Sequence, residues 1–169
     1  MRMGTRGAYG FRKGGLVKVT YKHSDSNPTS LGAKVAESIR AHPDEELSTI
    51  FDQIIMVKSG GKPSPEQVEE CLVYWDRGAS LQSPDEWYSL LRKSQGNLEA
   101  YANGLHYMID SAGFLKNTLF CAWGYVINLN EGTLEIYRGS LIQKVPLATI
   151  RGDPIYTGTL LEELERRDH

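Results

Sequence analysis

The sequence predicts an α+β fold: an antiparallel sheet built from an N-terminal and a C-terminal β-hairpin, with a central run of about five helices packed on it. Three observations predict this fold. Alternating strand-like residues flank Gly14-Gly15, an apolar run at 118–129 leads into a turn at 130–132, and helix-type spacing fills the stretch between them. A chain of 169 residues is expected to form a single globular domain over residues 1–169.

The N-terminal hairpin turns at Gly14-Gly15, because glycine readily adopts the positive φ angles of a tight turn. A two-residue loop would place residue 10 opposite residue 19, whereas a three-residue loop would place Tyr9 opposite Val19. We predict the three-residue loop, because it gathers the bulky side chains on one face. The predicted inner face holds Thr5, Gly7, Tyr9, Phe11, Val17, Val19, Tyr21 and His23, and the outer face holds Arg6, Arg12, Lys18 and Lys22.

Helices are expected at about residues 31–41, 43–55, 64–75, 83–91 and 97–109, where apolar residues recur every three or four positions. Ser64 and Ser83 each precede a proline and then, at the third helical position, a glutamine or a glutamate. This pattern indicates a capping box at a helix start. Residues 54–57 are rich enough in β-branched side chains to form a short strand instead.

The C-terminal part returns to β-structure. The run 118–129 is apolar on both faces, which is typical of a central strand covered on both sides. Residues 133–138 then form the return strand of a hairpin, and residues 141–157 add one or two short edge strands. The tail is expected to form a short amphipathic helix over residues 159–166.

Composition restricts the class of protein. A net charge of −2 disfavours a protein that coats long nucleic acid. No apolar run reaches the length of a membrane span. Cys71 and Cys121 lack metal or redox spacing, so we expect buried free thiols and a cytoplasmic location. The sequence contains no GxGxxG, Walker, HExxH or paired-cysteine zinc motif, and therefore predicts no cofactor and no metal.

Charge is unevenly distributed along the chain. Residues 1–24 contain six basic residues and no acidic residue, whereas residues 43–76 contain eight acidic residues against two lysines. Both stretches are compatible with ordinary solvated faces, and the acidic one could also meet a basic partner protein. The sequence leaves the oligomeric state open.

The favoured hypothesis is binding of a small anionic or nucleotide-like ligand. Basic side chains on one hairpin face can hold phosphate groups, and nearby aromatic rings can stack on a base. The predicted ligand-binding residues are Arg6, Arg12, Lys18, Tyr21, Lys22 and Ser26.

The alternative hypothesis is an amide hydrolase. A threonine that opens a hairpin, with an acidic residue after the second strand, resembles the start of the N-terminal-nucleophile hydrolases. That resemblance implies Thr5 as nucleophile and Asp25 as positioning acid, and His23 could serve as a conventional base. The chain departs from the family because Thr5 is preceded by four residues and has no free amine.

A second resemblance covers most of the chain in outline. The runs TRGAYGFRKGG, YKHSDSNPTSLG and LFCAWGYVINLNEGTLEIYRG resemble a group of small uncharacterised proteins of phages, actinobacteria and fungi. The group shares a TRG start and a YxHxDSxPxxLG segment, so a phage origin is a further expectation. The resemblance implies one site that contains Arg6, Tyr21, His23, Asp25 and Ser26. Asn27 stands where the group has an aromatic residue.

Overall fold

The computed structural model describes residues 5–76, 83–116 and 121–167. The elements are β1 (Gly7–Lys13), β2 (Leu16–Lys22), the π-helical turn η1 (Pro28–Gly32), α1 (Ala33–Ala41), α2 (Asp44–Gln53), β3 (Ile55–Val57), α3 (Pro65–Cys71), η2 (Leu72–Tyr74), α4 (Trp87–Leu90), η3 (Arg92–Ser94), α5 (Leu98–Ala102), β4 (Tyr107–Ile109), η4 (Ala112–Lys116), β5 (Trp123–Asn128), β6 (Thr133–Tyr137), β7 (Leu141–Pro146), α6 (Leu147–Gly152) and α7 (Pro154–Arg166). The predicted α+β class is confirmed.

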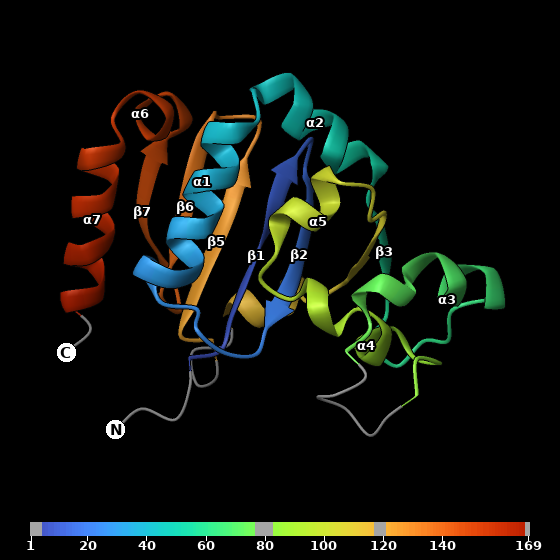
Figure 1. Ribbon diagram of the computed structural model, residues 1–169. Helices are drawn as coiled ribbons and strands as arrows, with labels where there is room; N and C mark the ends of the chain where they lie inside the picture. The colour runs from blue at the N-terminus through green and yellow to red at the C-terminus, as the bar shows by residue number, and fades with distance from the viewer. Residues whose placement is uncertain (1–4, 77–82, 117–120, 168–169) are drawn as a thin grey trace.

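The main sheet joins both hairpins in the order β2-β1-β5-β6-β7 (Figure 1). The prediction of a purely antiparallel sheet was wrong, because β1 pairs with β5 in parallel, from Gly7 opposite Trp123 to Arg12 opposite Asn128. A parallel pair needs a long crossover connection, and here the whole central helical region supplies it. The first three residues of the predicted 118–129 strand lie outside the described residues.

The first hairpin has the two-residue loop, not the predicted three-residue one. Gly14 and Gly15 have φ angles of 58° and 81°, as a mirror-image turn requires, and Gly10 lies opposite Val19. A register that differs by one residue exchanges the faces of a strand. The second strand therefore turns Lys18 and Lys22 to the face of Tyr9 and Phe11, and turns Val17 and Val19 to the opposite face.

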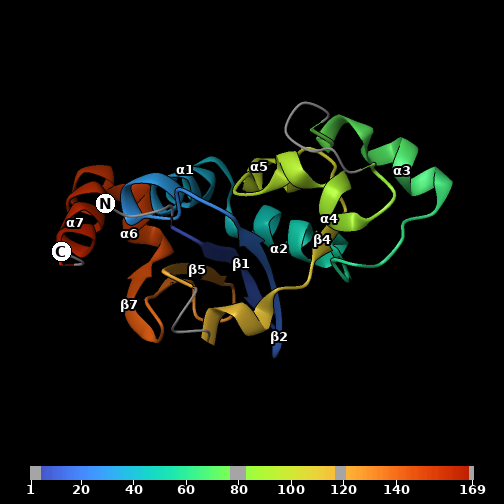
Figure 2. The same ribbon diagram turned by 90° about the horizontal axis from the view of Figure 1, so that it is seen from below.

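Helices cover one face of the main sheet. Figure 2 shows α1, α6 and α7 on one side of the strands, and the gold η4 on the other side. The helix-covered face contributes Tyr9, Phe11, Trp123 and Tyr125 to the large core cluster. The opposite face has a smaller cluster formed by Ala8, Val19, Leu115 and Val126. The prediction that both faces of the β5 strand are covered is confirmed, since all its residues are buried.

A second group of elements lies beyond the β2 edge. The short strands β3 and β4 form their own parallel pair, and Ser111 N–H donates to Val19 O at 2.8 Å to join this group to β2. Figures 1 and 2 both place α3 at the end of the molecule away from the main sheet, with α4 between α3 and the sheet. The predicted packing of the central helices on the sheet therefore holds only in part.

Helix boundaries follow the predicted signals unevenly. Ser64 forms the expected capping box with Gln67. Ser83 instead donates to the Asp85 carboxylate at 2.7 Å, and α4 begins only at Trp87. The predicted 97–109 helix ends at Ala102, near Gly104 with φ 111°, and its last residues form β4. The tail helix begins earlier than expected, because Asp153 caps it at the N–H of Tyr156.

A polar cluster ties α1 to its neighbours at His42. The imidazole bonds Glu46 through Nδ1 at 2.7 Å and Glu99 through Nε2 at 3.0 Å, while Arg151 donates to the His42 carbonyl. Burial alone would lower the pKa of His42, but the hydrogen bonds to Glu99 and Glu46 outweigh it and raise the pKa. The charged imidazolium is therefore favoured in the folded chain.

Stability is expected to fall as the pH rises through the folded pKa of His42, because a raised pKa stabilises the fold fully only below the unfolded value of about 6.5. Urea unfolding at about pH 5.5 and about pH 8.5 measures this loss, and His42→Gln should diminish it. His106→Gln is the control, because that ring forms no ion pair within the described chain. An unchanged pH dependence in His42→Gln would contradict the assignment.

Candidate functional site

The predicted catalytic residues do not come together. The Thr5 hydroxyl is buried and accepts the Ser26 N–H at 2.9 Å, while the Thr5 carbonyl accepts the same N–H at 3.2 Å. His23 bonds elsewhere: its Nδ1 lies 3.0 Å from the Tyr21 hydroxyl. The prediction that Thr5 and His23 share one hairpin face depended on the three-residue loop, and the observed register places them on opposite faces. Nucleophilic chemistry at Thr5 therefore has no support from the geometry.

Asp25 and Ser26 form a bend after β2 rather than an extension of the strand. Asp25 is exposed and has φ 57°, in the left-handed region. Ser26 is fully buried, its carbonyl accepts the Tyr125 hydroxyl at 2.7 Å, and its Oγ has no hydrogen-bond partner among the described residues. Gly7 is required next to it, since a Cβ there would lie 2.5 Å from the Ser26 Cβ. Ser26 therefore fastens the bend to the sheet, and it cannot reach a ligand in solvent.

The basic residues of the hairpin also separate, so the predicted cluster of four was wrong. Lys18 crosses to the helix side, where its ammonium donates to the carbonyls of Phe51 and Ile54, both at 2.7 Å. Arg12 bonds Glu135 on the opposite face at 3.3 Å. Burial lowers the pKa of Lys18, and the nearby Asp52 carboxylate opposes this effect only in part. Lys18 and Arg12 therefore form bonds within the fold, whereas Arg6 and Lys22 lie at the open end of the hairpin, away from the Gly14-Gly15 turn.

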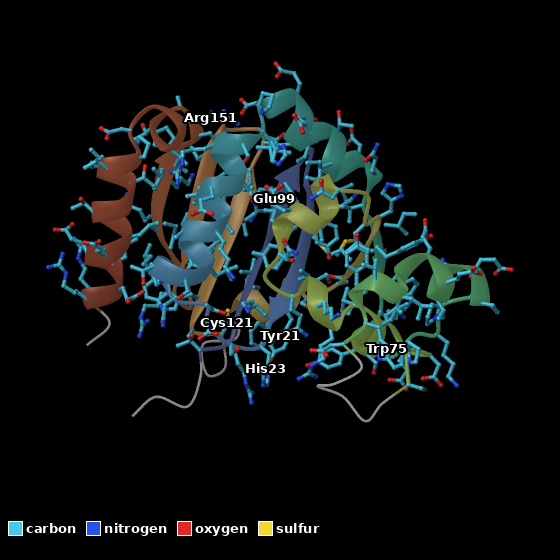
Figure 3. The ribbon with its side chains drawn as sticks, viewed as in Figure 1. Tyr21, His23, Trp75, Glu99, Cys121 and Arg151 are labelled. Carbon is cyan, nitrogen blue, oxygen red and sulfur yellow. The ribbon has the colours of Figure 1, made fainter. Side chains whose placement is uncertain are left out.

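A cavity of about 210 Å³ lies beside this open end, between β2 and the second group of elements. Its polar and apolar walls come from distant parts of the chain: Thr20, Tyr21, Ser59, Tyr88, Leu91, Ser94, Gln95, Tyr101, Ile109, Ser111 and Phe114. Because β2 is the edge strand of the main sheet, Thr20 and Tyr21 both reach the cavity although they point to opposite faces. Figure 3 shows Tyr21 and His23 at the end of β2 nearest α4.

Aromatic rings dominate one side of the cavity. Tyr21 and Phe114 meet edge to face, with ring centroids 5.1 Å apart and planes at 82°. Burial raises the pKa of Tyr21, while Arg6 lowers it by a smaller amount and Tyr88 raises it. The charge of Arg6 therefore acts on the Tyr21 hydroxyl, and Tyr88 lines the same cavity as Tyr21. The rings offer faces and edges on which a flat molecule can stack.

The polar groups of the cavity are neutral. The Gln95 side-chain carbonyl accepts the His23 N–H at 3.1 Å, which leaves the amide NH₂ as a donor. The Ser94 hydroxyl is already used, because it donates to the Leu91 carbonyl at 2.7 Å. Ser59 and Ser111 add further hydroxyls. No charged side chain lines the cavity within the described residues, so it suits an uncharged group with hydrogen-bonding edges.

Metal and thiol chemistry have no geometric basis in the described ranges. No three His, Cys, Asp or Glu side chains gather there as a metal site would need. Cys71 and Cys121 are free and buried, as predicted, and burial raises the pKa of each thiol to about 11. A thiol with a raised pKa is a poor nucleophile. No helix in the described parts of the chain has both the length and the apolar character to cross a bilayer.

Searches against protein-family models, curated proteins and solved structures each found no match to this chain. Of the residues predicted from sequence, Tyr21 lines the cavity, and Arg6, Lys22 and His23 lie near its mouth. The other walls were missed, because residues such as Tyr88 and Phe114 belong to helical segments with no local signal of function.

Proposed function

We propose that the protein binds a small anionic, nucleotide-like ligand and that the aromatic ring of this ligand occupies the cavity beside β2. The observation that carries the proposal is the composition of the walls: tyrosine and phenylalanine rings together with neutral hydrogen-bonding groups, at the end of a strand with nearby cations. Such a combination of apolar walls and a few convergent polar groups is typical of small-molecule sites.

The size of the cavity limits what enters it. Drug-sized ligands occupy about 300–1,000 Å³, so a cavity of about 210 Å³ accommodates one ring system and not a whole nucleotide. The ring would stack against Tyr21, Tyr88 or Phe114, and the Gln95 amide would donate to an acceptor on its edge. The rest of the ligand then lies outside the cavity.

The charge of the ligand is inferred from the surroundings of the mouth. Arg6 is exposed and close enough to lower the pKa of Tyr21, although burial has the larger and opposite effect on that pKa. His23 is also exposed and is held to the site by its backbone bond to Gln95. An anionic substituent that emerges from the cavity therefore meets basic groups first.

Tyr88→Ala is expected to weaken ligand binding by roughly tenfold or more, because loss of a stacking ring costs about 1–3 kcal/mol per base. Thermal shift with a panel of nucleosides and nucleotides identifies a binder, and calorimetry then measures its affinity. Ser59→Trp supplies a second test, since a large ring at an exposed position of the wall should fill the cavity without removing a core side chain.

Tyr156→Ala is the matched control. Tyr156 is half exposed on α7 and does not line the cavity, so its loss should leave the affinity unchanged. If no compound of the panel raises the melting temperature of the wild type, or if Tyr88→Ala and Tyr156→Ala bind it equally well, the proposal is wrong.

A further inference from the structure

A second and larger hollow, which we call the lysine groove, lies next to the cavity. It has a volume of about 610 Å³ and runs between α1 and the segment 93–99. Lys34 and Lys93 line it from opposite sides, and Gly96 forms part of its floor. Lys22 of β2 lies against this glycine, since a Cβ on Gly96 would fall 2.5 Å from the Lys22 Cε.

The three lysines lack the partners that exposed lysines often have. Within residues 5–76, 83–116 and 121–167, none of them has a carboxylate oxygen within ion-pair distance. Burial lowers the pKa of Lys22, and repulsion from Lys34 lowers it further, while Asp25 opposes both effects. Two ammonium groups thus share a region that contains too little negative charge. An anion between them would remove this repulsion.

The acidic residues of the groove do not cancel this charge. The Glu99 carboxylate is bonded to His42, whose Nε2 lies 3.0 Å from Glu99 Oε1 and 3.1 Å from Glu99 Oε2. Glu37 lies on the exposed side of α1 and forms no ion pair within the described residues. Asn97 adds an exposed amide whose side chain does not cap α5. The groove is therefore lined by the ammonium groups of Lys34 and Lys93, with Lys22 beside it, and the Glu37 carboxylate is the one on its lining that forms no ion pair within the described residues.

The groove and the cavity are adjacent. Gln95 lines both hollows, with Ser94 on the cavity side and Gly96 on the groove side. The end of β2 also lies between the two hollows, because Tyr21 lines the cavity and the next residue, Lys22, lies against Gly96 of the groove. A ligand whose ring is in the cavity can therefore extend past Gln95 toward the lysines.

We propose that the lysine groove binds the phosphate groups of the ligand, with Lys22, Lys34 and Lys93 as donors to phosphate oxygens. This inference rests on the proposed function, to which it adds the place and the chemistry of the anionic part. Lysine ammonium groups bind phosphate as compact point charges, and several of them suit a chain of phosphates better than a single carboxylate. The ligand is then a nucleoside polyphosphate or a compound of the same chemistry.

The experiment compares three kinds of probe by calorimetry: nucleosides, their triphosphates and inorganic tripolyphosphate. Each of Lys34→Gln and Lys93→Gln should weaken triphosphate and tripolyphosphate binding by roughly three- to tenfold, and should leave nucleoside binding unchanged. Both residues are exposed, so their loss should not disturb folding. Lys22→Gln tests the half-buried lysine. Higher salt should weaken both anionic probes.

Lys62→Gln is the matched control, because Lys62 is an exposed lysine that does not line the groove. Triphosphate binding that is insensitive to the groove variants but lost in Tyr88→Ala would overturn this inference and leave the proposed function in place. If no nucleoside or triphosphate binds, the proposed function fails. Tripolyphosphate then decides whether the groove itself binds phosphate, since it must bind the wild type and lose affinity in Lys34→Gln.

Discussion

Gly10→Ala is expected to destabilise the protein by about 3 kcal/mol or more, and the soluble yield should fall accordingly. A Cβ at this position would lie 2.0 Å from the Lys18 carbonyl oxygen and 2.7 Å from the Val19 Cα. Both atoms belong to the backbone of β2, which cannot rotate away as a side chain can. The two strands would have to separate where β1 also pairs with β5. Chemical denaturation followed by circular dichroism measures the loss.

Gly152→Ala is the control for this change. Nothing lies within 4 Å of a Cβ at Gly152, and its φ angle is not in the left-handed region. Its free energy of unfolding should therefore stay within about 0.5 kcal/mol of the wild type or rise slightly, because alanine restricts the unfolded chain. Equal stabilities for the two variants would show that the close approach of β1 and β2 is not needed.

Glu135→Ala should cost about 2–3 kcal/mol of stability. Glu135 is 4% exposed on β6, and its carboxylate accepts hydrogen bonds from Tyr137 at 2.7 Å, Asn128 at 2.9 Å and Arg12 at 3.3 Å. Removal of the carboxylate takes away its bonds to the Arg12 guanidinium and the Asn128 amide, which keep, within the described residues, only a 3.2 Å bond to the Tyr137 hydroxyl and a 3.4 Å bond to Glu131. The cost stays below that of a fully buried pair, because the Arg12 side chain is 32% exposed.

Asp52→Ala gives the comparison for an exposed pair. The Asp52 carboxylate on α2 bonds the Lys13 ammonium on β1 at 2.8 Å. Because the Asp52 side chain is 59% exposed, its loss should lower the free energy of unfolding by less than about 1 kcal/mol. The two variants should also differ in acid. Burial alone would raise the pKa of Glu135, but the bonds from Tyr137, Asn128 and Arg12 outweigh it and lower the pKa. This stabilisation is complete above the unfolded pKa and is lost as the pH falls through the folded one.

Acid unfolding of the wild type should therefore include a step that is absent in Glu135→Ala, measured as the dependence of the unfolding free energy on pH below about 5. Asp52→Ala should keep that step. If Glu135→Ala and the wild type lose stability with acid in the same way, the ionised Glu135 carboxylate does not stabilise the fold, and the prediction is wrong.

Local signals in the sequence predicted local structure well. The turn at Gly14-Gly15, the cap at Ser64 and the return strand after residue 132 each depend on a few neighbouring residues, and each formed. The predicted register was wrong because the geometry of the two-glycine turn outweighs the tendency of bulky side chains to share one face. Lys18 shows why the tendency is not decisive. Its ammonium lies on the helix-covered side of the sheet, where the Phe51 and Ile54 carbonyls accept its hydrogen bonds, and no sequence pattern indicates such partners.

Long-range pairing was the main limit on predicting the fold. Sequential strands usually pair with each other, so the parallel contact of β1 with β5 had no local indication. The same limit applies to the candidate site. Tyr21 and Lys22 could be singled out because they follow a recognisable strand, but Tyr88, Gln95 and Phe114 reach them only through tertiary folding.

The parallel pairing of β1 with β5 also has a consequence during synthesis on the ribosome. The first hairpin is made before the central region, but the strand that pairs with the inner edge of β1 is made only after it. Until then both edges of the hairpin are unpaired and can pair with strands of other chains. The cavity beside β2 also lacks the support of β5, β6 and β7, which complete the sheet. A nascent chain arrested before Trp123 should therefore be sensitive to protease at the hairpin, and one extended past Pro146 should be protected.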